Sequence, residues 1–242
     1  MAGPEDLKPL SGDWSAALAI IAHPDDMEFG AAAAVARWTA EGKRVCYLLV
    51  TRGEAGIDSM PPEEVGPLRE EEERKGAVLV GVDEVEFLDY RDGTVEYGLP
   101  LRRDFARAIR RHRPDLLITL SHHLTWENGP LNMADHRWVG LAVMDAARDA
   151  GNRWIFPELL SEGLEPWSGV KRVCVSGSPH PTHSVDVTDF IEKGIASLEE
   201  HRLYLENLPE GSDFVSSVRA QAAETGRRAG RRYAVSFEVI DI

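Results

Sequence analysis

The sequence is poor in cysteine, and this scarcity limits the kinds of site that it can build. Among its 242 residues only Cys46 and Cys174 are cysteines, and each lies within an apolar stretch. A metal site made of cysteine ligands needs several of them at close spacing, so this kind of site is excluded. Both residues are predicted to be free, buried thiols of the type found in a reducing cytosol.

Basic side chains and long apolar runs are also scarce. The chain has 27 lysine and arginine residues against 41 aspartate and glutamate residues, which gives a formal net charge of −14. This charge repels phosphate groups and argues against nucleic acid and anionic membrane surfaces as partners. No apolar run reaches the roughly 18–20 residues of a membrane span, and the first residues do not resemble a signal peptide. We therefore expect a cytoplasmic protein without a membrane or nucleic-acid partner.

What the sequence does contain is a regular alternation of apolar and amphipathic segments. The apolar segments that are typical of strands lie at residues 17–22, 44–51, 85–90, 115–120, 171–176, 183–187 and 231–240. Short apolar strands separated by amphipathic helices indicate a parallel sheet covered on both faces. One long helix is predicted over 191–208. Because no repeat, linker or change of composition divides the chain, residues 1–242 are predicted to form a single α/β domain.

Ionisable residues are concentrated directly after the first four predicted strands. The stretches that carry them are residues 23–26, 51–56, 89–94 and 121–136. The carboxyl ends of parallel strands meet at one edge of a sheet, and α/β proteins bind their ligands at that edge. We therefore expect these four stretches to form one site.

The sequence AHPDDMEFG places two adjacent carboxylates after the first strand. Asp25 and Asp26 would repel each other in one site unless a cation is bound between them. His23 and Asp26 are the natural ligands of such a cation, and His136 after the fourth strand is the best third ligand. Two histidines and one carboxylate with an open fourth position form a catalytic zinc site, and Asp25 stays free to deprotonate the zinc-bound water.

A second interpretation of the same residues stays open at this stage. An aspartate that follows a strand is often only the N-cap of the next helix, which would account for Asp25 and Asp26 without any chemistry. In the same way, Asp135 could be a cap and His136 an exposed neighbour. The residues alone do not separate the cap from the metal site.

Five motifs in order along the first part of the chain resemble one known family. They are AHPDDMEFG at 22–30, TRGEAG at 51–56, REEE at 69–72, YRDG at 90–93 and ADHRWVG at 134–140. This set is similar to the LmbE/PIG-L family of metal-dependent N-deacetylases, and residues 185–202 resemble a later segment of that family. The resemblance implies a Rossmann-like three-layer αβα sandwich with a mainly parallel sheet. It also implies Zn2+ as cofactor and removal of an acetyl group from an N-acetylated amino sugar, such as an N-acetylglucosaminyl conjugate.

The resemblance also implies roles for individual residues through the motifs that they match. The metal ligands would be His23, Asp26 and His136, and the general base would be Asp25. Sugar hydroxyls would be held by Arg69, Asp92 and, as a weaker match, Glu54. Asp135 would orient its neighbours.

One residue departs from the family pattern. The family commonly carries a histidine three residues before the last ligand, where it helps to stabilise the oxyanion, and this chain has Met133 there. Methionine has no N–H to donate, so another group must take over this role. We expect His183 to be the stand-in catalytic residue, ahead of His122 and His123.

Two other classes of function compete with the deacetylase. Two histidines and a carboxylate also satisfy the iron site of non-haem Fe(II) oxygenases, although those sites usually lie on all-β scaffolds. A catalytically silent metal- or sugar-binding module is the other candidate, because Met133 removes a catalytic group. A free Asp25 beside a full ligand set argues against it. The expected partner is a small amino sugar, and homo-oligomers are common among similar proteins.

Overall fold

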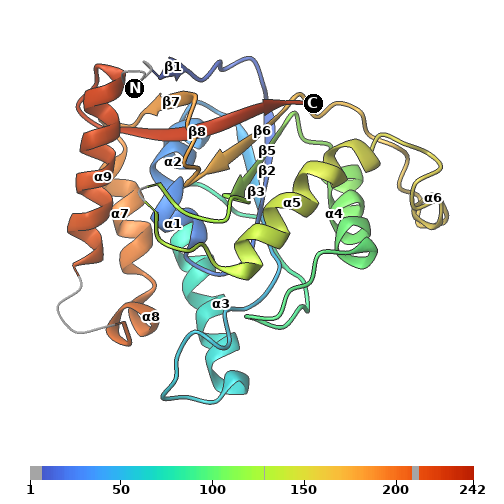
Figure 1. Ribbon diagram of the computed structural model, residues 1–242, viewed down its shortest axis with the longest axis horizontal. Helices are drawn as coiled ribbons and strands as arrows, with labels where there is room; N and C mark the ends of the chain where they lie inside the picture. The colour runs from blue at the N-terminus through green and yellow to red at the C-terminus, as the bar shows by residue number, and fades with distance from the viewer. Residues whose placement is uncertain (1–6, 128, 209–212) are drawn as a thin grey trace.

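One mixed sheet organises the chain in the computed structural model (Figure 1), which describes residues 7–127, 129–208 and 213–242. The sheet has eight strands in the order β1-β7-β8-β6-β5-β2-β3-β4. The strands are β1 (Lys8–Pro9), β2 (Ala16–Ile21), β3 (Arg44–Leu49), β4 (Val85–Phe87), β5 (Leu116–Leu120), β6 (Arg172–Ser176), β7 (His183–Asp186) and β8 (Ala234–Asp241). Neighbouring strands run parallel except at β8, which is antiparallel to β6 and β7.

Helices cover both faces of this sheet, as the alternating sequence pattern predicts. They are α1 (Asp26–Gly30), α2 (Ala32–Ala40), α3 (Pro62–Leu79), α4 (Leu99–His112), α5 (Ala134–Asp149), α6 (Glu158–Ser161), α7 (Ile191–Glu199), α8 (Arg202–Glu206) and α9 (Phe214–Ala229). Side chains of α2, α3, α7 and α9 pack on one face, and those of α4 and α5 pack on the other. Figure 1 shows α2, α7 and α9 to the left of the central strands, α3 below them, and α4 and α5 to the right. The predicted three-layer αβα sandwich is confirmed.

The central strand β2 shows why such strands are apolar throughout. Ala17, Ala19 and Ile21 belong to the core on one face, whereas Leu18 and Ile20 belong to the core on the other. Successive side chains of a strand point to opposite faces, so a strand between two helical layers buries both sets. The two cysteines, Cys46 in β3 and Cys174 in β6, are free and buried within such strands, as predicted.

Two helical regions differ from the prediction. The segment 191–208, predicted as one helix, forms α7 and α8 with an interruption at Glu200 and His201. His201 adopts a non-helical backbone (φ −78°, ψ 49°) and is fully buried, so the chain turns inward at this residue. Helix α9 was not predicted at all, although Asp213 provides a helix start signal by accepting a hydrogen bond from the Ser216 N–H.

The topology creates one switch point in the sheet, and a ligand is expected to bind there. From β2 the chain continues outward through β3 and β4, whereas β5 lies on the other side of β2. Strand order therefore reverses between β2 and β5, and α/β sheets bind ligands at such switch points. The loops that follow β2 and β5 carry His23 and the described residues 121–127 and 129–133 to this point. Among the described residues, no helix is both long and apolar enough to cross a bilayer.

Candidate active site

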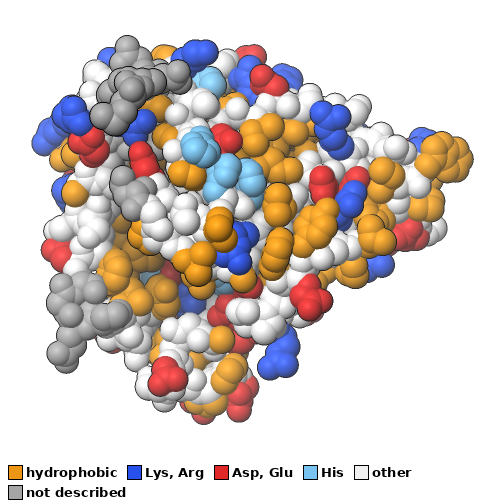
Figure 2. Space-filling view, in the orientation of Figure 1, with side chains coloured by type: hydrophobic (Ala, Val, Ile, Leu, Met, Phe, Trp, Pro, Cys, Tyr) orange, Lys and Arg blue, Asp and Glu red, His pale blue; other side chains and the backbone are white. Residues whose placement is uncertain are grey.

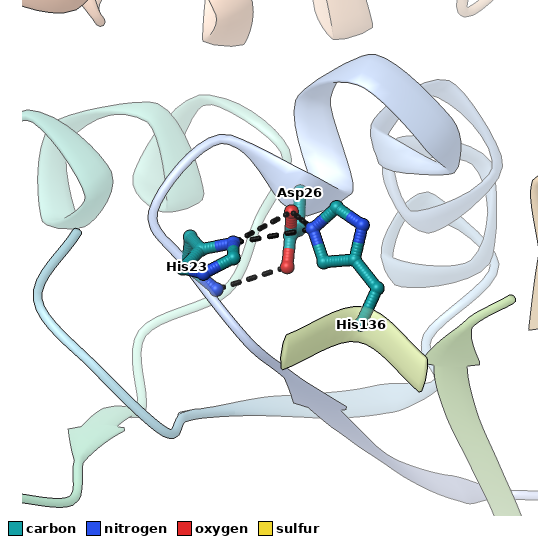
Figure 3. A group of neighbouring side chains, drawn as sticks. All are labelled: His23, Asp26 and His136. Atoms are coloured by element: carbon teal, nitrogen blue, oxygen red, sulfur yellow. Dashed lines mark hydrogen bonds and ion pairs between the residues drawn. The ribbon is translucent and has the colours of Figure 1, made fainter. Parts of the chain in front are cut away.

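Three side chains converge at the switch point (Figure 3). His23 follows β2, Asp26 begins α1, and His136 lies in the first turn of α5. One atom of each side chain points to a common centre. His136 Nε2 lies 3.1 Å from His23 Nδ1 and 3.1 Å from Asp26 Oδ1. The remaining pair, His23 Nδ1 and Asp26 Oδ1, is 3.7 Å apart. The structure thus brings together the three residues that the sequence predicts as metal ligands.

The outward atoms of these three side chains are all held by the protein. Asp26 Oδ2 accepts the backbone N–H groups of Ala22 and His23, both at 2.9 Å. His136 Nδ1 lies 3.1 Å from Oδ1 of Asn132, whose amide in turn donates to backbone carbonyls of the loop after β5. With its outer atom engaged, each side chain presents one fixed nitrogen or oxygen atom to the centre.

Asp135 and Asp92 hold the third ligand, His23. His23 Nε2 lies 3.1 Å from Asp92 Oδ1 and 3.3 Å from Asp135 Oδ2. Asp135 also accepts the backbone N–H groups of Gly93 and Val95, at 2.8 and 3.2 Å, and therefore ties α5 to the loop after β4. These contacts agree with the orienting role that we predict for Asp135.

Glu54 lies in the layer behind Asp92 and not at the cavity. Its Oε1 accepts the backbone N–H of Asp92 at 2.9 Å, and Asp92 Oδ2 accepts the backbone N–H of Ala55 at 2.9 Å. Glu54 is not among the described residues that line the cavity. In the structure Glu54 holds the loop that carries Asp92. It does not line the cavity where we predict it to contact a sugar hydroxyl.

Asp25 occupies a strained backbone position beside the three converging residues. Its φ of 91° lies in the region that favours glycine, so surrounding contacts must hold it there. Glu73 Oε2 accepts the Asp25 backbone N–H at 3.1 Å, and Arg69 Nη2 donates to Asp25 Oδ2 at 3.1 Å and to the Pro24 carbonyl at 2.6 Å. Burial raises the pKa of Asp25 to about 7, and the nearby Asp26 carboxylate acts in the same direction. The strain is thus located at the predicted general base.

The donor set and its charge fit a divalent cation. The carboxyl groups of Asp25, Asp26 and Asp135 are buried within this small region, and Arg69 is the buried arginine that contacts one of them. Although burial acts in the opposite direction, His136 and His23 hold the pKa of Asp26 well below its ordinary value, so that carboxyl group stays ionised. Buried negative charge of this kind is stabilised by a bound metal ion. Imidazole and carboxylate ligands suit zinc and also non-haem iron.

A cavity of about 790 Å³ opens directly above the converging residues. It reaches His23, Asp25, Asp26 and His136 at one end and passes between α1 and α9 at the other. Figure 2 shows a group of histidine side chains and scattered hydrophobic side chains on the face of the molecule that it draws. Typical ligand pockets measure about 300–1,000 Å³, so this cavity is large enough for a small molecule.

Tyr204 is a cavity residue that the sequence analysis missed. Its ring stacks on the guanidinium of Arg69, whose Cζ lies 4.0 Å from the ring centroid, and it lines the cavity together with Asp25 and Asp26. Burial and the Asp25 carboxylate raise the pKa of Tyr204 to about 12, which keeps its hydroxyl protonated. No hydrogen bond within the described ranges occupies this hydroxyl, so it is free to donate to a ligand. The sequence does not indicate Tyr204 as a site residue, because it lies within the segment 191–208 that is predicted as one continuous helix.

Arg69 lines the cavity, but its Nη1 and Nη2 groups donate hydrogen bonds to other groups of the protein. Besides its bonds to Pro24 and Asp25, its Nη1 donates to the Gly53 carbonyl at 2.8 Å. Only 2% of the residue is exposed. The contacts that the structure gives Arg69 are therefore with Asp25, with the two backbone carbonyls and with the ring of Tyr204.

The structure does not bring His183 to the cavity, which corrects our expectation for this residue. His183 begins β7 and pairs with Lys8 of the edge strand β1. Its ring lies 2.9 Å from the hydroxyl of Thr182, and burial together with the charges of Lys8 and Arg172 lowers its pKa. The prediction failed because strand order is invisible in the sequence: β8 inserts between β6 and β7 and moves His183 away from β5.

Met133, by contrast, does line the cavity, as do Trp126 and His136. The Trp126 ring stands at 73° to the His136 ring with the centroids 5.5 Å apart, so this tryptophan forms a wall beside the metal-ligand group. His122 and His123 lie outside the lining: His123 Nε2 is 2.8 Å from Glu238, and the rings of the two histidines are 4.2 Å apart. Neither histidine stands in for the missing one.

Fold and site together define an α/β protein with a histidine–carboxylate centre at the carboxyl edge of its sheet. The family described as PIG-L, GlcNAc-PI de-N-acetylase, matches residues 18–147, which is more than half of the chain. The chain belongs to this family, and the resemblance seen in its motifs is confirmed.

Relatives and solved structures of this family resemble the chain over most of its length. Diacetylchitobiose deacetylase of Thermococcus kodakarensis is 29% identical over 232 residues, covering 94% of this chain and 84% of the relative. The structure of N,N'-diacetylchitobiose deacetylase from Pyrococcus horikoshii in complex with an inhibitor superposes with a TM-score of 0.85 at 26% identity, over 94% and 84% of the two chains. A deacetylase of 1D-myo-inositol 2-acetamido-2-deoxy-alpha-D-glucopyranoside from Streptomyces scabiei is 28% identical over 70% of this chain and 58% of its own length.

Proposed function

We propose that this protein is a metal-dependent hydrolase that removes the acetyl group from an N-acetylated amino sugar of the N-acetylglucosamine type. The observation that carries the proposal is the convergence of His23, Asp26 and His136 beside a free, strained Asp25 at the floor of a cavity. The names of the similar proteins, which are deacetylases of acetamido sugars, support the same reaction. The proposal treats the chain as one domain.

His23, Asp26 and His136 would hold the metal ion, and zinc is the ion that this ligand set suits best. When bound, zinc polarises the amide carbonyl and lowers the pKa of a water molecule to about 7. Asn132 Oδ1 accepts from the ring of His136, and the carboxylates of Asp92 and Asp135 accept from the ring of His23, which keeps the ligand atoms in place. The α/β fold of the chain disfavours the alternative of an Fe(II) oxygenase, whose sites usually lie on all-β scaffolds.

Asp25 is the general base of the proposed reaction. It takes a proton from the attacking water as the new C–O bond forms, and it returns that proton to the amine nitrogen as the C–N bond breaks. Acetate and the free amino sugar leave the site. A pKa of about 7 suits a group that takes up and releases a proton near neutral pH. Arg69 aligns this carboxyl group through its bond to Oδ2.

Tyr204 supplies the hydrogen bond that the family histidine would supply at position 133. Negative charge develops on the carbonyl oxygen during the attack, and one donor aimed at this oxygen is worth about 10²–10³ in rate. Met133 cannot donate, whereas the Tyr204 hydroxyl is protonated, free of other partners in the described chain and next to Asp25 in the cavity. Asp92 borders the same cavity and is the residue best placed to accept a sugar hydroxyl.

Metal analysis combined with an acetate-release assay tests the proposal. We expect the purified protein to hold about one equivalent of zinc and to release acetate from N-acetylglucosamine or from N,N'-diacetylchitobiose, and chelation should abolish the release. Iron together with turnover of 2-oxoglutarate would identify an oxygenase instead. Bound metal without any acetate release would favour a silent binding module.

A further inference from the structure

The cavity extends well beyond the space that one sugar ring needs. Its polar end is formed by the metal-ligand group and Asp25, but the lining continues past Phe29 of α1 to α9 and β8. Figure 1 shows α9 as the outermost helix on this side, with α7 and α1 beside it. At about 790 Å³, the cavity lies in the upper part of the range of about 300–1,000 Å³ that drug-sized ligands occupy.

The far part of the cavity, which we call the α9 lobe, has a mainly apolar wall. The residues that form this wall are Phe29, Ile191, Phe214, Val218, Ala222 and Val235. Phe29 and Phe214 meet edge to face with their ring centroids 5.7 Å apart, and Ile191 and Ala222 are buried. Contact between this apolar surface and an apolar group of a ligand makes the free energy of binding more favourable. Contact with the hydroxyl groups of a second sugar does not.

Most polar side chains that α9 contributes to the lobe lie at its outer rim, and buried Thr225 is the exception. Ser217, Gln221 and Glu224 of α9 line the cavity but are exposed to solvent. Arg228 at the end of α9 is paired with Glu127 of the loop after β5, with 3.3 Å between Nη1 and Oε1. An apolar wall behind a polar rim is the arrangement expected where a flexible apolar group enters from the catalytic end and water stays outside.

We propose that the α9 lobe binds an aliphatic chain carried by the substrate, so that the preferred substrate is an N-acylated amino sugar with an alkyl or acyl substituent. This inference rests on the proposed function for the sugar end of the substrate. The chain is attached either through the glycosidic oxygen or as the N-acyl group itself. Both attachments start within the cavity and lead to the same apolar wall, and each fully buried methylene group tightens binding by up to about fourfold.

A series of alkyl glycosides tests the assignment. Methyl, butyl and octyl glycosides of N-acetylglucosamine are compared with N-octanoylglucosamine, below their micelle concentrations and with the zinc-loaded protein. We expect the KM and the Kd from titration calorimetry to fall at least tenfold from methyl to octyl glycoside, or from N-acetyl to N-octanoyl glucosamine. Whichever compound gains identifies the point of attachment. Equal values for the three glycosides, together with equal values for N-acetylglucosamine and N-octanoylglucosamine, would overturn the inference.

Variants of α9 locate the effect. Val218→Asp places a charge in the α9 lobe, and Val218→Trp fills it without a charge, so both should abolish the gain from the octyl chain relative to the methyl glycoside measured with the same variant. Ala220→Asp is the matched control, because Ala220 is exposed on the same helix and is not among the described lining residues. A gain that survives in both Val218 variants would contradict the assignment.

The calorimetric Kd separates this inference from the proposed function. Chain-dependent binding without any release of acetate or fatty acid would overturn the hydrolase and leave the α9 lobe as the chain-binding site. Acetate release that does not depend on chain length in either KM or Kd would keep the hydrolase and overturn the lobe.

Discussion

Two buried trios of histidine and carboxylate side chains lie close to Asp25, and they differ in how their atoms are used. The first is the metal-ligand group of His23, Asp26 and His136, and the second consists of Glu28, Glu73 and His201. In the second trio, His201 Nε2 lies 3.6 Å from Glu28 Oε2 and 3.8 Å from Glu73 Oε2. These distances are close to those of the first trio, so proximity alone does not distinguish a ligand set from a packed core.

The two trios differ in the hydrogen bonds of the atoms that face away from their centres. In the first trio each outward atom has a hydrogen-bond partner, which leaves one free atom per side chain pointing to a common centre. In the second trio both ring nitrogens of His201, one oxygen of Glu28 and one of Glu73 have no partner among the described residues. Oriented ligands make a metal site, because the surrounding contacts fix each ring and carboxylate before the ion arrives.

The two trios also differ in the charge of their side chains. Burial raises the pKa of Glu28 to about 7 and that of Glu73 well above its ordinary value, and burial lowers the pKa of His201 to about 3. Near pH 7 Glu73 is therefore protonated, His201 is neutral and Glu28 is partly protonated, whereas Asp26 in the first trio stays ionised. The second trio contributes through Glu73, which holds the backbone N–H of Asp25.

Exchanging one histidine for alanine in each trio gives the largest expected contrast. His136→Ala leaves two protein ligands, which is too few for a stable catalytic zinc site, so metal and activity should both be lost almost completely. His201→Ala should keep about one equivalent of zinc. Metal analysis of the two purified variants and their acetate release measure the contrast. Full zinc occupancy in His136→Ala would refute the ligand assignment.

The next largest effect is expected at the general base. Asp25→Asn should retain zinc, because Asp25 is not a ligand, and should lose about 10²–10⁴ in kcat, because the proton acceptor is gone. Asp26→Asn is the matched variant and should lose the metal. If metal analysis finds the reverse, with zinc lost in Asp25→Asn and kept in Asp26→Asn, the two carboxylates have been assigned the wrong way round.

Tyr204→Phe removes one hydroxyl group and tests the donor that replaces the family histidine. We expect kcat to fall about 10²–10³-fold with zinc content unchanged and KM little affected, because the bond forms to the oxyanion. Adding Met133→His to Tyr204→Phe should restore part of the rate, since it returns an N–H donor to the cavity wall. Tyr97→Phe is the control, because Tyr97 is exposed and its hydroxyl is bonded to Asp145. An unchanged kcat in Tyr204→Phe would leave the oxyanion to the metal alone.

Glu73 offers a smaller effect that sharpens the comparison of the trios. Glu73→Gln keeps an acceptor for the Asp25 N–H and should leave kcat within a few-fold, whereas Glu73→Leu removes that acceptor. For the leucine variant we expect a loss of about tenfold in kcat and a free energy of unfolding lower by about 1–3 kcal/mol, the cost of an unsatisfied buried N–H. Denaturant unfolding and steady-state kinetics provide both numbers. Equal behaviour of the two variants would show that the hydrogen bond to Asp25 has no effect on the reaction.

The sequence predicts the layered fold and the metal-ligand group because both depend on local patterns. Apolar runs mark the central strands, and His23, Asp26 and His136 lie directly after two of them or at a helix start. Tyr204 and Glu73 could not be found in this way, because Glu73 reaches Asp25 and Tyr204 reaches Arg69 only through the packing of α3, α8 and the β2–α1 loop. The inward turn at buried His201, which ends α7 and carries Tyr204 to the cavity, is likewise a tertiary effect.

His183 is the position where the sequence and the structure lead to different experimental outcomes, and the expected effect is the smallest of the series. From the sequence, His183→Ala should lower turnover at least tenfold, because the residue would be the oxyanion donor. The structure places its ring against Thr182 on β7, next to the edge strand β1 and outside the cavity lining, so we expect kcat and zinc content within about twofold of the unmodified protein. Tyr204→Phe, measured in parallel, is the positive control for loss of a donor. A tenfold fall in His183→Ala with zinc unchanged would restore the original assignment and would require that β7 approach the cavity during turnover.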